Sequence, residues 1–332
     1  MTSMNSIPPL SASYPIEIAF PDIRRFAEGN TGVAYVHSFD SGVPGPHVMV
    51  NSLTHGNEVS GAIAVAGLLE HGLRPRRGKL TLSFASVDAY HSFDPAHPDA
   101  SRYVDQDFNR VWSPEILDDA SKDSNEICRA RQMRPVIATV DMLLDLHSMH
   151  EYGPPMIVCT GKDKHMKFAR RMGTPANVIC DTGHPDGRRM IDYGDFDDDG
   201  SPRDALAVET GHHWQAASVA VAKDTAVRFL LMSGVVDRAD IPQDWFGPEP
   251  GAQRFIRVTQ PVVATSLDFH FTVPVNGLET FPEAGTVFGY QDGQPVATPW
   301  NDCVLVMPSV RHLRPGVTVV RLGKTIEQPA AR

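Results

Sequence analysis

The sequence has few cysteines, no long apolar run and no basic tract, and each absence argues against a class of protein. Its four cysteines, at positions 128, 159, 180 and 303, form no Cys-x-x-Cys pair, so we expect buried thiols rather than a cysteine zinc site or a redox disulfide. No segment approaches the ~18–20 apolar residues that a membrane span needs. There are 30 basic against 40 acidic residues, and no Lys/Arg run could follow a phosphate backbone. We therefore expect neither nucleic acid nor membrane as a partner.

The first residues, Met1 to Pro21, have neither the basic start nor the uninterrupted apolar stretch of a secretion signal. The expectation that follows is a cytoplasmic protein. With 332 residues, 42% of them hydrophobic, the chain is long enough for one large or two ordinary domains around a packed core. The sequence leaves open whether the chain forms a homo-oligomer.

Short apolar runs alternate with amphipathic stretches between Gly32 and Met232, which is the pattern of a sheet covered by helices. The fold class that we predict is α/β, with a mixed, mostly parallel sheet flanked by helices. The predicted strands cover 33–39, 47–53, 80–87, 140–146, 155–160, 177–180 and 205–209. The predicted helices cover 58–71, 125–138, 164–172 and 216–232.

The pattern changes after the segment 238–251, whose three prolines indicate a linker. Beyond it the helical period disappears, and short segments rich in β-branched residues are separated by turns such as Asn276-Gly277. These segments are 255–258, 262–265, 269–273, 286–290, 303–307 and 317–321. We predict an α/β domain over 1–240 and a smaller C-terminal all-β domain over 252–325.

The strongest local signal for chemistry lies between a predicted strand and a predicted helix, where His55 and Glu58 are three positions apart. In a helical first turn the two side chains share a face and can bind one ion. A catalytic zinc usually takes three protein ligands, and His147, at the end of another apolar strand, is the third that we expect. Asp145 shares a strand face with His147 and can accept a hydrogen bond from it. A helix cap near an ordinary histidine is the alternative.

Two further segments carry residues suited to hydrolysis. The loop 102–110 contains two arginines, which near zinc offer a clamp for a carboxylate and a fixed positive charge for an oxyanion. Surface arginines paired with Asp105 or Asp107 are the alternative. Glu209, at the end of another apolar strand, can take a proton from water and pass it to a leaving amine, unless it caps a helix.

The segments around His55 and Glu58, around Arg102 and Arg110, around His147 and around Glu209 occur along the chain in the same order as in the succinylglutamate desuccinylase and aspartoacylase family, which this sequence therefore resembles. That family is itself similar to zinc carboxypeptidases. The interval of 89 positions between Glu58 and His147 is also similar to the interval in that family. Phe108 and Thr210 depart from the residues usual in the family, and both changes are mild. The resemblance implies a zinc carboxypeptidase-like α/β domain followed by a smaller β domain. The motifs that carry it are His55-Gly56-Asn57-Glu58, the segment 102–110, Asp145-Leu146-His147 and Val208-Glu209-Thr210-Gly211.

The resemblance also implies the roles of individual residues. One zinc ion (Zn2+) per chain would be bound by His55, Glu58 and His147. Glu209 would be the general base and acid of the reaction. Arg102 would polarise the scissile carbonyl and hold its oxyanion.

Asn109 and Arg110 would, by the same resemblance, bind a carboxylate of the substrate. The implied activity is hydrolysis of the non-peptide amide bond of a small N-acyl amino acid or a related carboxylate-bearing amide. A metallocarboxypeptidase acting on short peptides and a non-catalytic module that binds zinc or a carboxylate are the alternatives. Weaker candidates for substrate contact are Arg188, Arg189, Tyr193 and Tyr290.

Two other patterns are weighed and set aside. The segment 195–200 begins like a calcium loop, but its twelfth position is Leu206, where a bidentate glutamate is needed. We interpret it as a solvated acidic loop. His212 and His213 follow Glu209 closely, and we expect for them a hydrogen-bonding role or none.

Overall fold

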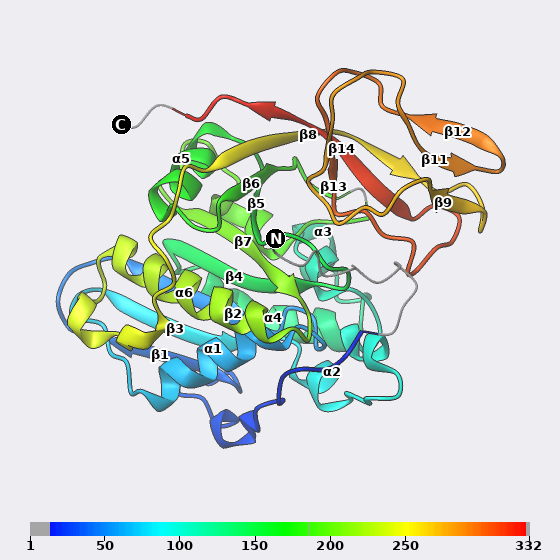
Figure 1. Cartoon of the computed structure of the whole chain (residues 1–332). Helices are drawn as coiled ribbons and strands as arrows, with labels where there is room; N and C mark the ends of the chain where they lie inside the picture. The colour runs from blue at the N-terminus through cyan, green and yellow to red at the C-terminus, as the bar shows by residue number, and fades with distance from the viewer. Residues whose placement is uncertain (1–13, 185, 330–332) are drawn as a thin grey trace.

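One long mixed sheet with helices on both faces forms most of the molecule, as the computed structural model of residues 14–184 and 186–329 shows (Figure 1). Its strand order is β1-β3-β2-β4-β7-β5-β6-β8-β14-β13-β10. The strands are β1 Val36–Asp40, β2 His47–Ser52, β3 Lys79–Phe84, β4 Met142–Met149, β5 Met156–Cys159, β6 Asn177–Cys180, β7 Asp204–His212, β8 Arg254–Val263, β10 Thr280–Phe281, β13 Cys303–Val306 and β14 Thr318–Ile326. The helices are α1 Val59–Glu70, α2 Val87–His91, α3 Pro114–Leu117, α4 Asn125–Ile137, α5 Asp163–Met172 and α6 Ala216–Ser233.

The helix-flanked part of the sheet is mostly parallel, as expected. Strands β3, β2, β4 and β7 pair in parallel, and β5 and β6 pair in parallel with each other, whereas β1 and β5 run antiparallel to β3 and β7. Parallel strands end at the same edge of a sheet, which is where open α/β folds place their sites. In the β4–β7 ladder His147 lies opposite Glu209.

Alternate side chains of the central strands enter two separate cores. On one face Val50 and Leu144 pack among apolar residues of α1 and α6. On the other face the adjacent residues Met49 and Leu143 pack against α4. Because the strands are buried on both faces, they appear in the sequence as almost continuous apolar runs. Within the described residues, no helix combines the length and the apolar character that crossing a bilayer requires.

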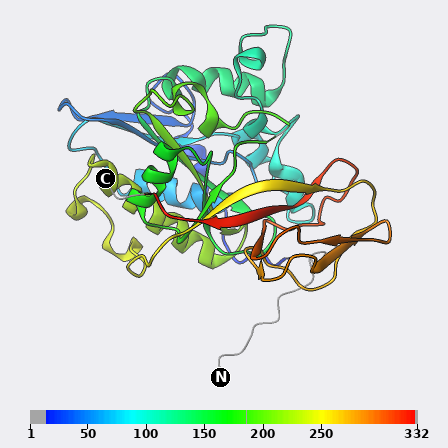
Figure 2. The same ribbon diagram turned by 90° about the horizontal axis from the view of Figure 1, so that it is seen from above.

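The C-terminal strands extend the large sheet. Strand β8 pairs in parallel with β6, and β14, β13 and β10 follow it in antiparallel ladders. Figure 2 shows β8 and β14 side by side across the molecule. The predicted strands 255–258 and 262–265 are in fact one strand, β8, which continues through Pro261.

A separate three-stranded sheet lies at the end of the molecule farthest from β1 (Figure 1). It consists of β9 Phe269–Phe271, β11 Val287–Gln291 and β12 Gln294–Ala297. The predicted fold class, a mixed sheet with helices and a smaller C-terminal β structure, is confirmed. The division into domains at 1–240 and 252–325 stays a prediction.

Candidate active site

The carboxyl-end edge of the sheet brings His55, Glu58 and His147 together. Glu58 Oε1 lies 2.7 Å from His55 Nδ1, and Glu58 Oε2 lies 2.9 Å from His147 Nδ1. One ligand atom of each residue lies within 4.8 Å of the others, and all three residues are buried. No other group of three such residues was found in the described part of the chain. Two imidazoles and a carboxylate are a donor set that zinc takes in catalytic sites.

The second nitrogen of each histidine is also matched to a carboxylate. His147 Nε2 lies 2.6 Å from Asp145 Oδ2, and His55 Nε2 lies 2.9 Å from Asp107 Oδ1. When each Nε2–H donates to its aspartate, each Nδ1 presents a lone pair toward the carboxylate of Glu58. Lone pairs and a carboxylate that face one another need a positive charge between them. A divalent cation supplies that charge, so the arrangement fits a metal ion.

The protonation states of these residues follow from the same charges. Burial would raise the pKa of Glu58, but His55 and His147 hold it well below its ordinary value. Burial would lower the pKa of His147, but Asp145 and Glu58 hold it well above its ordinary value. Without a metal ion, a proton on His147 therefore balances the carboxylates beside it, and metal binding there must displace that proton.

Asp145 is itself fully buried and held in place by two donors from the adjacent segment. Asn51 Nδ2 and Thr54 Oγ1 each donate to Asp145 Oδ1 at 2.8 Å. The β2–β4 ladder sets Asn51 opposite Asp145. This residue therefore occupies the supporting position that the sequence predicts for it.

Glu209 lies beside His147 on the adjacent strand, β7. Its Oε2 is buried and has no hydrogen-bond partner among the described residues. Burial raises the pKa of Glu209 to about 7, and the charge of Glu58 adds to this, although His147 opposes it most strongly. A carboxyl group with a pKa near neutrality and no partner is suited to exchanging a proton.

Arg102 is the last residue of the short helix Pro98–Arg102, and its side chain reaches the same place. Its Nη2 donates to Asp107 Oδ2 at 3.0 Å, and its Nη1 lies 3.5 Å from Glu58 Oε1. The pairing with Asp107 that the sequence offered as an alternative is therefore present. It occurs next to His55 and Glu58 rather than on a remote surface, so Asp107 aligns both Arg102 and His55.

Glu126 holds the loop between Arg102 and Asp107, and sequence analysis missed it. This α4 residue is 1% exposed, and its carboxylate accepts hydrogen bonds from the backbone N–H groups of Val104, Asp105 and Gln106 at 2.7, 3.2 and 3.1 Å. The sequence gave no signal for it, because an acid near a helix N-terminus is common and the contact spans about twenty residues.

Asn109 and Arg110 follow in the turn Phe108–Arg110, and the structure gives them different surroundings. Asn109 Oδ1 accepts a hydrogen bond from the N–H of Met190 at 2.9 Å, so this oxygen connects two loops. Arg110 has no carboxylate partner among the described residues, and its Nη1 donates to the Asn109 carbonyl at 2.7 Å. Burial lowers the pKa of Arg110, and Arg102 and Arg321 lower it further against the opposing charge of Asp107. A largely buried, unpaired guanidinium favours binding of an anion.

The weaker candidates have partners of their own. Arg189 pairs with Asp192 at 2.7 Å, and Arg188 lies 3.5 Å from Asp197. The remaining two contact aromatic rings: Tyr193 packs on Trp112, and Tyr290 stacks on His270 in the second sheet.

The two patterns that were set aside have structural roles. His213 Nδ1 forms a hydrogen bond of 2.8 Å with Ser148 Oγ, as expected of a hydrogen-bonding residue. The acidic segment 195–200 contacts a lysine: Lys164 Nζ donates to the carbonyls of Asp195 and Asp198 at 3.4 and 2.7 Å. An ammonium group thus satisfies carbonyls of the segment that resembles a calcium loop.

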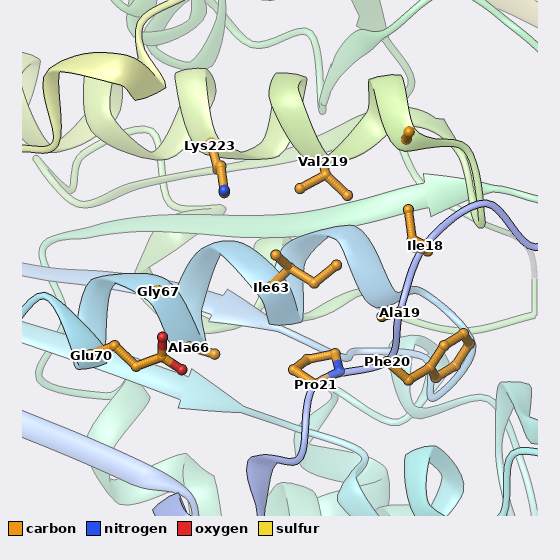
Figure 3. A pocket seen from close by; sticks show the side chains of 11 residues that line it. Ile18, Ala19, Phe20, Pro21, Ile63, Ala66, Gly67, Glu70, Val219 and Lys223 are labelled. Carbon is orange, nitrogen blue, oxygen red and sulfur yellow. The ribbon is translucent and has the colours of Figure 1, made fainter.

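A separate hollow of about 560 Å³ lies between α1, α6 and residues 18–21, and it is largely apolar (Figure 3). None of His55, Glu58 and His147 lines it. We therefore assign the chemistry to the polar site at the sheet edge.

Comparison with known proteins identifies a similar catalytic domain. Residues 44–200 match the catalytic domain of succinylglutamate desuccinylase/aspartoacylase, a span that includes His55, Glu58 and His147 and ends before Glu209. No curated protein matches the chain.

Solved structures of similar fold cover most of the chain. The succinylglutamate desuccinylase of Chromobacterium violaceum superposes with a TM-score of 0.63 at 18% identity, over 90% of each chain. The enzyme of Vibrio parahaemolyticus gives 0.61 at 16% identity, over 89% of this chain and 87% of that one. A product-bound ectoine utilization protein from Ruegeria pomeroyi gives 0.63 at 12% identity, over 88% and 89%.

Proposed function

Because this chain belongs to the succinylglutamate desuccinylase/aspartoacylase family, we propose that it is a zinc-dependent hydrolase that cleaves the amide bond of a small N-acyl amino acid or a related carboxylate-bearing amide. The observation that carries the proposal is the buried His55–Glu58–His147 group with the unpartnered carboxyl group of Glu209 beside it. A cytoplasmic location and the state of assembly remain predictions from the sequence.

Three residues would hold one zinc ion, namely His55, Glu58 and His147. Bound there, zinc would act as a Lewis acid toward the scissile carbonyl and bring the pKa of water toward ~7. Asp145 and Asp107 would keep the two imidazoles oriented for it.

The other residues would handle the proton, the developing charge and the substrate. Glu209 would take a proton from the attacking water as the water oxygen bonds to the carbonyl carbon. It would then deliver that proton to the amine nitrogen as the carbon–nitrogen bond breaks. Arg102 would donate to the carbonyl oxygen as it gains negative charge. Arg110, which has no ion pair with any carboxylate among the described residues, would bind a carboxylate of the substrate.

Two alternatives differ in what they predict. A metallocarboxypeptidase with the same zinc chemistry would release free amino acids from dipeptides. A binding module would take up zinc or a carboxylate without turnover. Three protein ligands next to an unpartnered carboxyl group favour an enzyme, since purely structural zinc is normally closed by four ligands.

The test is amine release by zinc-loaded protein from a panel of N-acetyl, N-succinyl and N-formyl amino acids. We expect activity on a few acids, a loss of about 10²–10⁴-fold in the Glu209→Gln variant, and one zinc per chain in both proteins. Undiminished activity in the variant would contradict the role of Glu209. If zinc binds but no substrate of the panel is cleaved, the metallocarboxypeptidase acting on peptides is favoured. If neither activity nor bound zinc is found, the binding module is favoured.

A further inference from the structure

The C-terminal strand β14 carries an arginine, Arg321, close to the candidate active site. Its side chain is only 20% exposed, and its Nε lies 3.2 Å from Oδ2 of Asp181, the residue that follows β6. The backbone carbonyl of Asp181 also accepts a hydrogen bond from Arg189 Nη2 at 3.0 Å. Asp181 therefore fixes Arg321 against the loop that packs on Asn109 and Arg110.

The packing of that loop on Arg110 is close. The N–H of Met190 donates to Asn109 Oδ1, and Gly187 approaches so closely that a Cβ there would lie 2.2 Å from the Arg110 carbonyl oxygen and 3.1 Å from its Cβ. Arg110 from the main α/β part and Arg321 from the C-terminal strands thus reach the same loop from two sides.

Both guanidinium groups have N–H donors that are not used in the contacts given above. A guanidinium has five N–H donors. Among the described residues, Arg321 has one ion pair, through Nε to Asp181, and Arg110 has none. Two largely buried cations that have a single ion pair in the described part of the chain are incompletely compensated by the protein alone.

The charges of Arg110 and Arg321 both affect one residue, His184. Burial, Arg110 and Arg321, in that order, lower the pKa of His184 to about 4, so the imidazole is neutral near pH 7. Arg321 is also close enough to interact electrostatically with Glu209. The cationic pair therefore adjoins the carboxyl group that we propose as the base.

We propose that Arg321 is a second substrate-binding arginine, which shares one substrate carboxylate with Arg110 and so makes the C-terminal strands part of the substrate site. The inference rests on the proposed function and assigns to Arg321 a part in the recognition of the substrate carboxylate. A carboxylate between the two guanidinium groups would accept hydrogen bonds from both and remove their mutual repulsion. Neutral His184 would border the same anion without adding a charge.

The test compares Arg321→Gln with Arg321→Lys and with Arg257→Gln, which removes the same charge from an exposed position on adjacent β8. The substrates are the best acid of the panel and its carboxamide. We expect Arg321→Gln to raise KM for the acid about 10–100-fold and to change KM for the carboxamide less than about 3-fold, because a charge-assisted bond is lost only with the acid. Arg321→Lys should recover part of the loss, and Arg257→Gln should match the wild type.

A binding measurement separates this inference from the proposed function, since it needs no turnover. Succinate is titrated calorimetrically into zinc-loaded wild type, Arg321→Gln and Arg257→Gln proteins. We expect at least about 10-fold weaker binding in Arg321→Gln alone. Equal binding in all three proteins, or equal rises in KM for acid and carboxamide, would overturn the role of Arg321. If the wild type cleaves no amide, the proposed function fails and the calorimetric result still decides the role of this residue.

Discussion

His147 and Asp145 extend from the same face of β4, and the histidine Nε2 donates a hydrogen bond of 2.6 Å to the aspartate Oδ2. This bond determines that Nδ1 is the nitrogen that faces Glu58. Because the aspartate charge makes the ring a better ligand, Asp145→Asn should weaken zinc binding about 10–100-fold. Competition with a chromophoric chelator measures this. Asp40→Asn, at an exposed strand end, is the control, and equal affinities in the two variants would refute the prediction.

Glu126 gives a second prediction, because its carboxylate supports the loop after Arg102 and forms no hydrogen bond with the candidate metal ligands among the described residues. Glu126→Ala should lower kcat/KM about 10–100-fold and leave zinc content at the wild-type level, since a displaced guanidinium no longer meets the carbonyl oxygen. Glu126→Gln keeps an acceptor oxygen and should lose less. The control is Glu115→Ala, an exposed acid of α3. Loss of zinc along with activity would show a collapse of the site instead.

Gly187 and Gly183 form a matched pair for testing the Arg110 loop. Both have positive φ angles, +147° and +132°, but a Cβ at 187 would meet the Arg110 carbonyl at 2.2 Å, whereas a Cβ at 183 meets nothing within 4 Å. Both alanine variants should be destabilised, by about 2–3 kcal/mol at 187 and about 1 kcal/mol at 183. Only Gly187→Ala should also raise KM for acidic substrates. The same KM in both variants would argue against close packing on Arg110.

Asp204 links stability to pH. Burial raises the pKa of this carboxyl group at the start of β7 to about 7, against the opposing charge of Lys164. The folded protein therefore binds this proton more tightly than the unfolded chain, so the stabilisation is complete at low pH and is lost as the pH rises from about 4 through 7. Asp204→Asn should match the wild type near pH 4 and be about 1–3 kcal/mol more stable at pH 8. Urea unfolding across this range is the measurement, and parallel pH profiles would contradict the assignment.

Much of the α/β part can be predicted from the sequence because its signals are local. The predicted strand 177–180 coincides with β6, and the predicted helix 125–138 exceeds α4 by one residue. His55 and Glu58 could be proposed because they are three positions apart between a strand and a helix, and His147 because it ends another apolar run; the structure does bring the three together.

What could not be predicted depends on contacts between distant segments. Periodicity marks a strand without saying which edge it joins, so the pairing of β8 with β6 was not foreseen. The short strands Thr280–Phe281 and Gln294–Ala297 carry too few apolar residues for a pattern. Glu126 and Arg321 are ordinary charged residues in the sequence, and only the folded chain shows that one supports a loop and that the other lies near Asp181 and the candidate site.

The β6–β8 ladder also has a mechanical consequence. Because hydrogen bonds run without a break from β1 to β10, the C-terminal strands cannot swing away on the linker as a hinged lid. Exchange of substrate and product therefore does not proceed through such a hinge. Truncation of the chain after residue 240 would leave the backbone N–H and C=O groups of β6 unpaired at an exposed sheet edge, so the shortened protein should aggregate. The truncation would also remove Arg321.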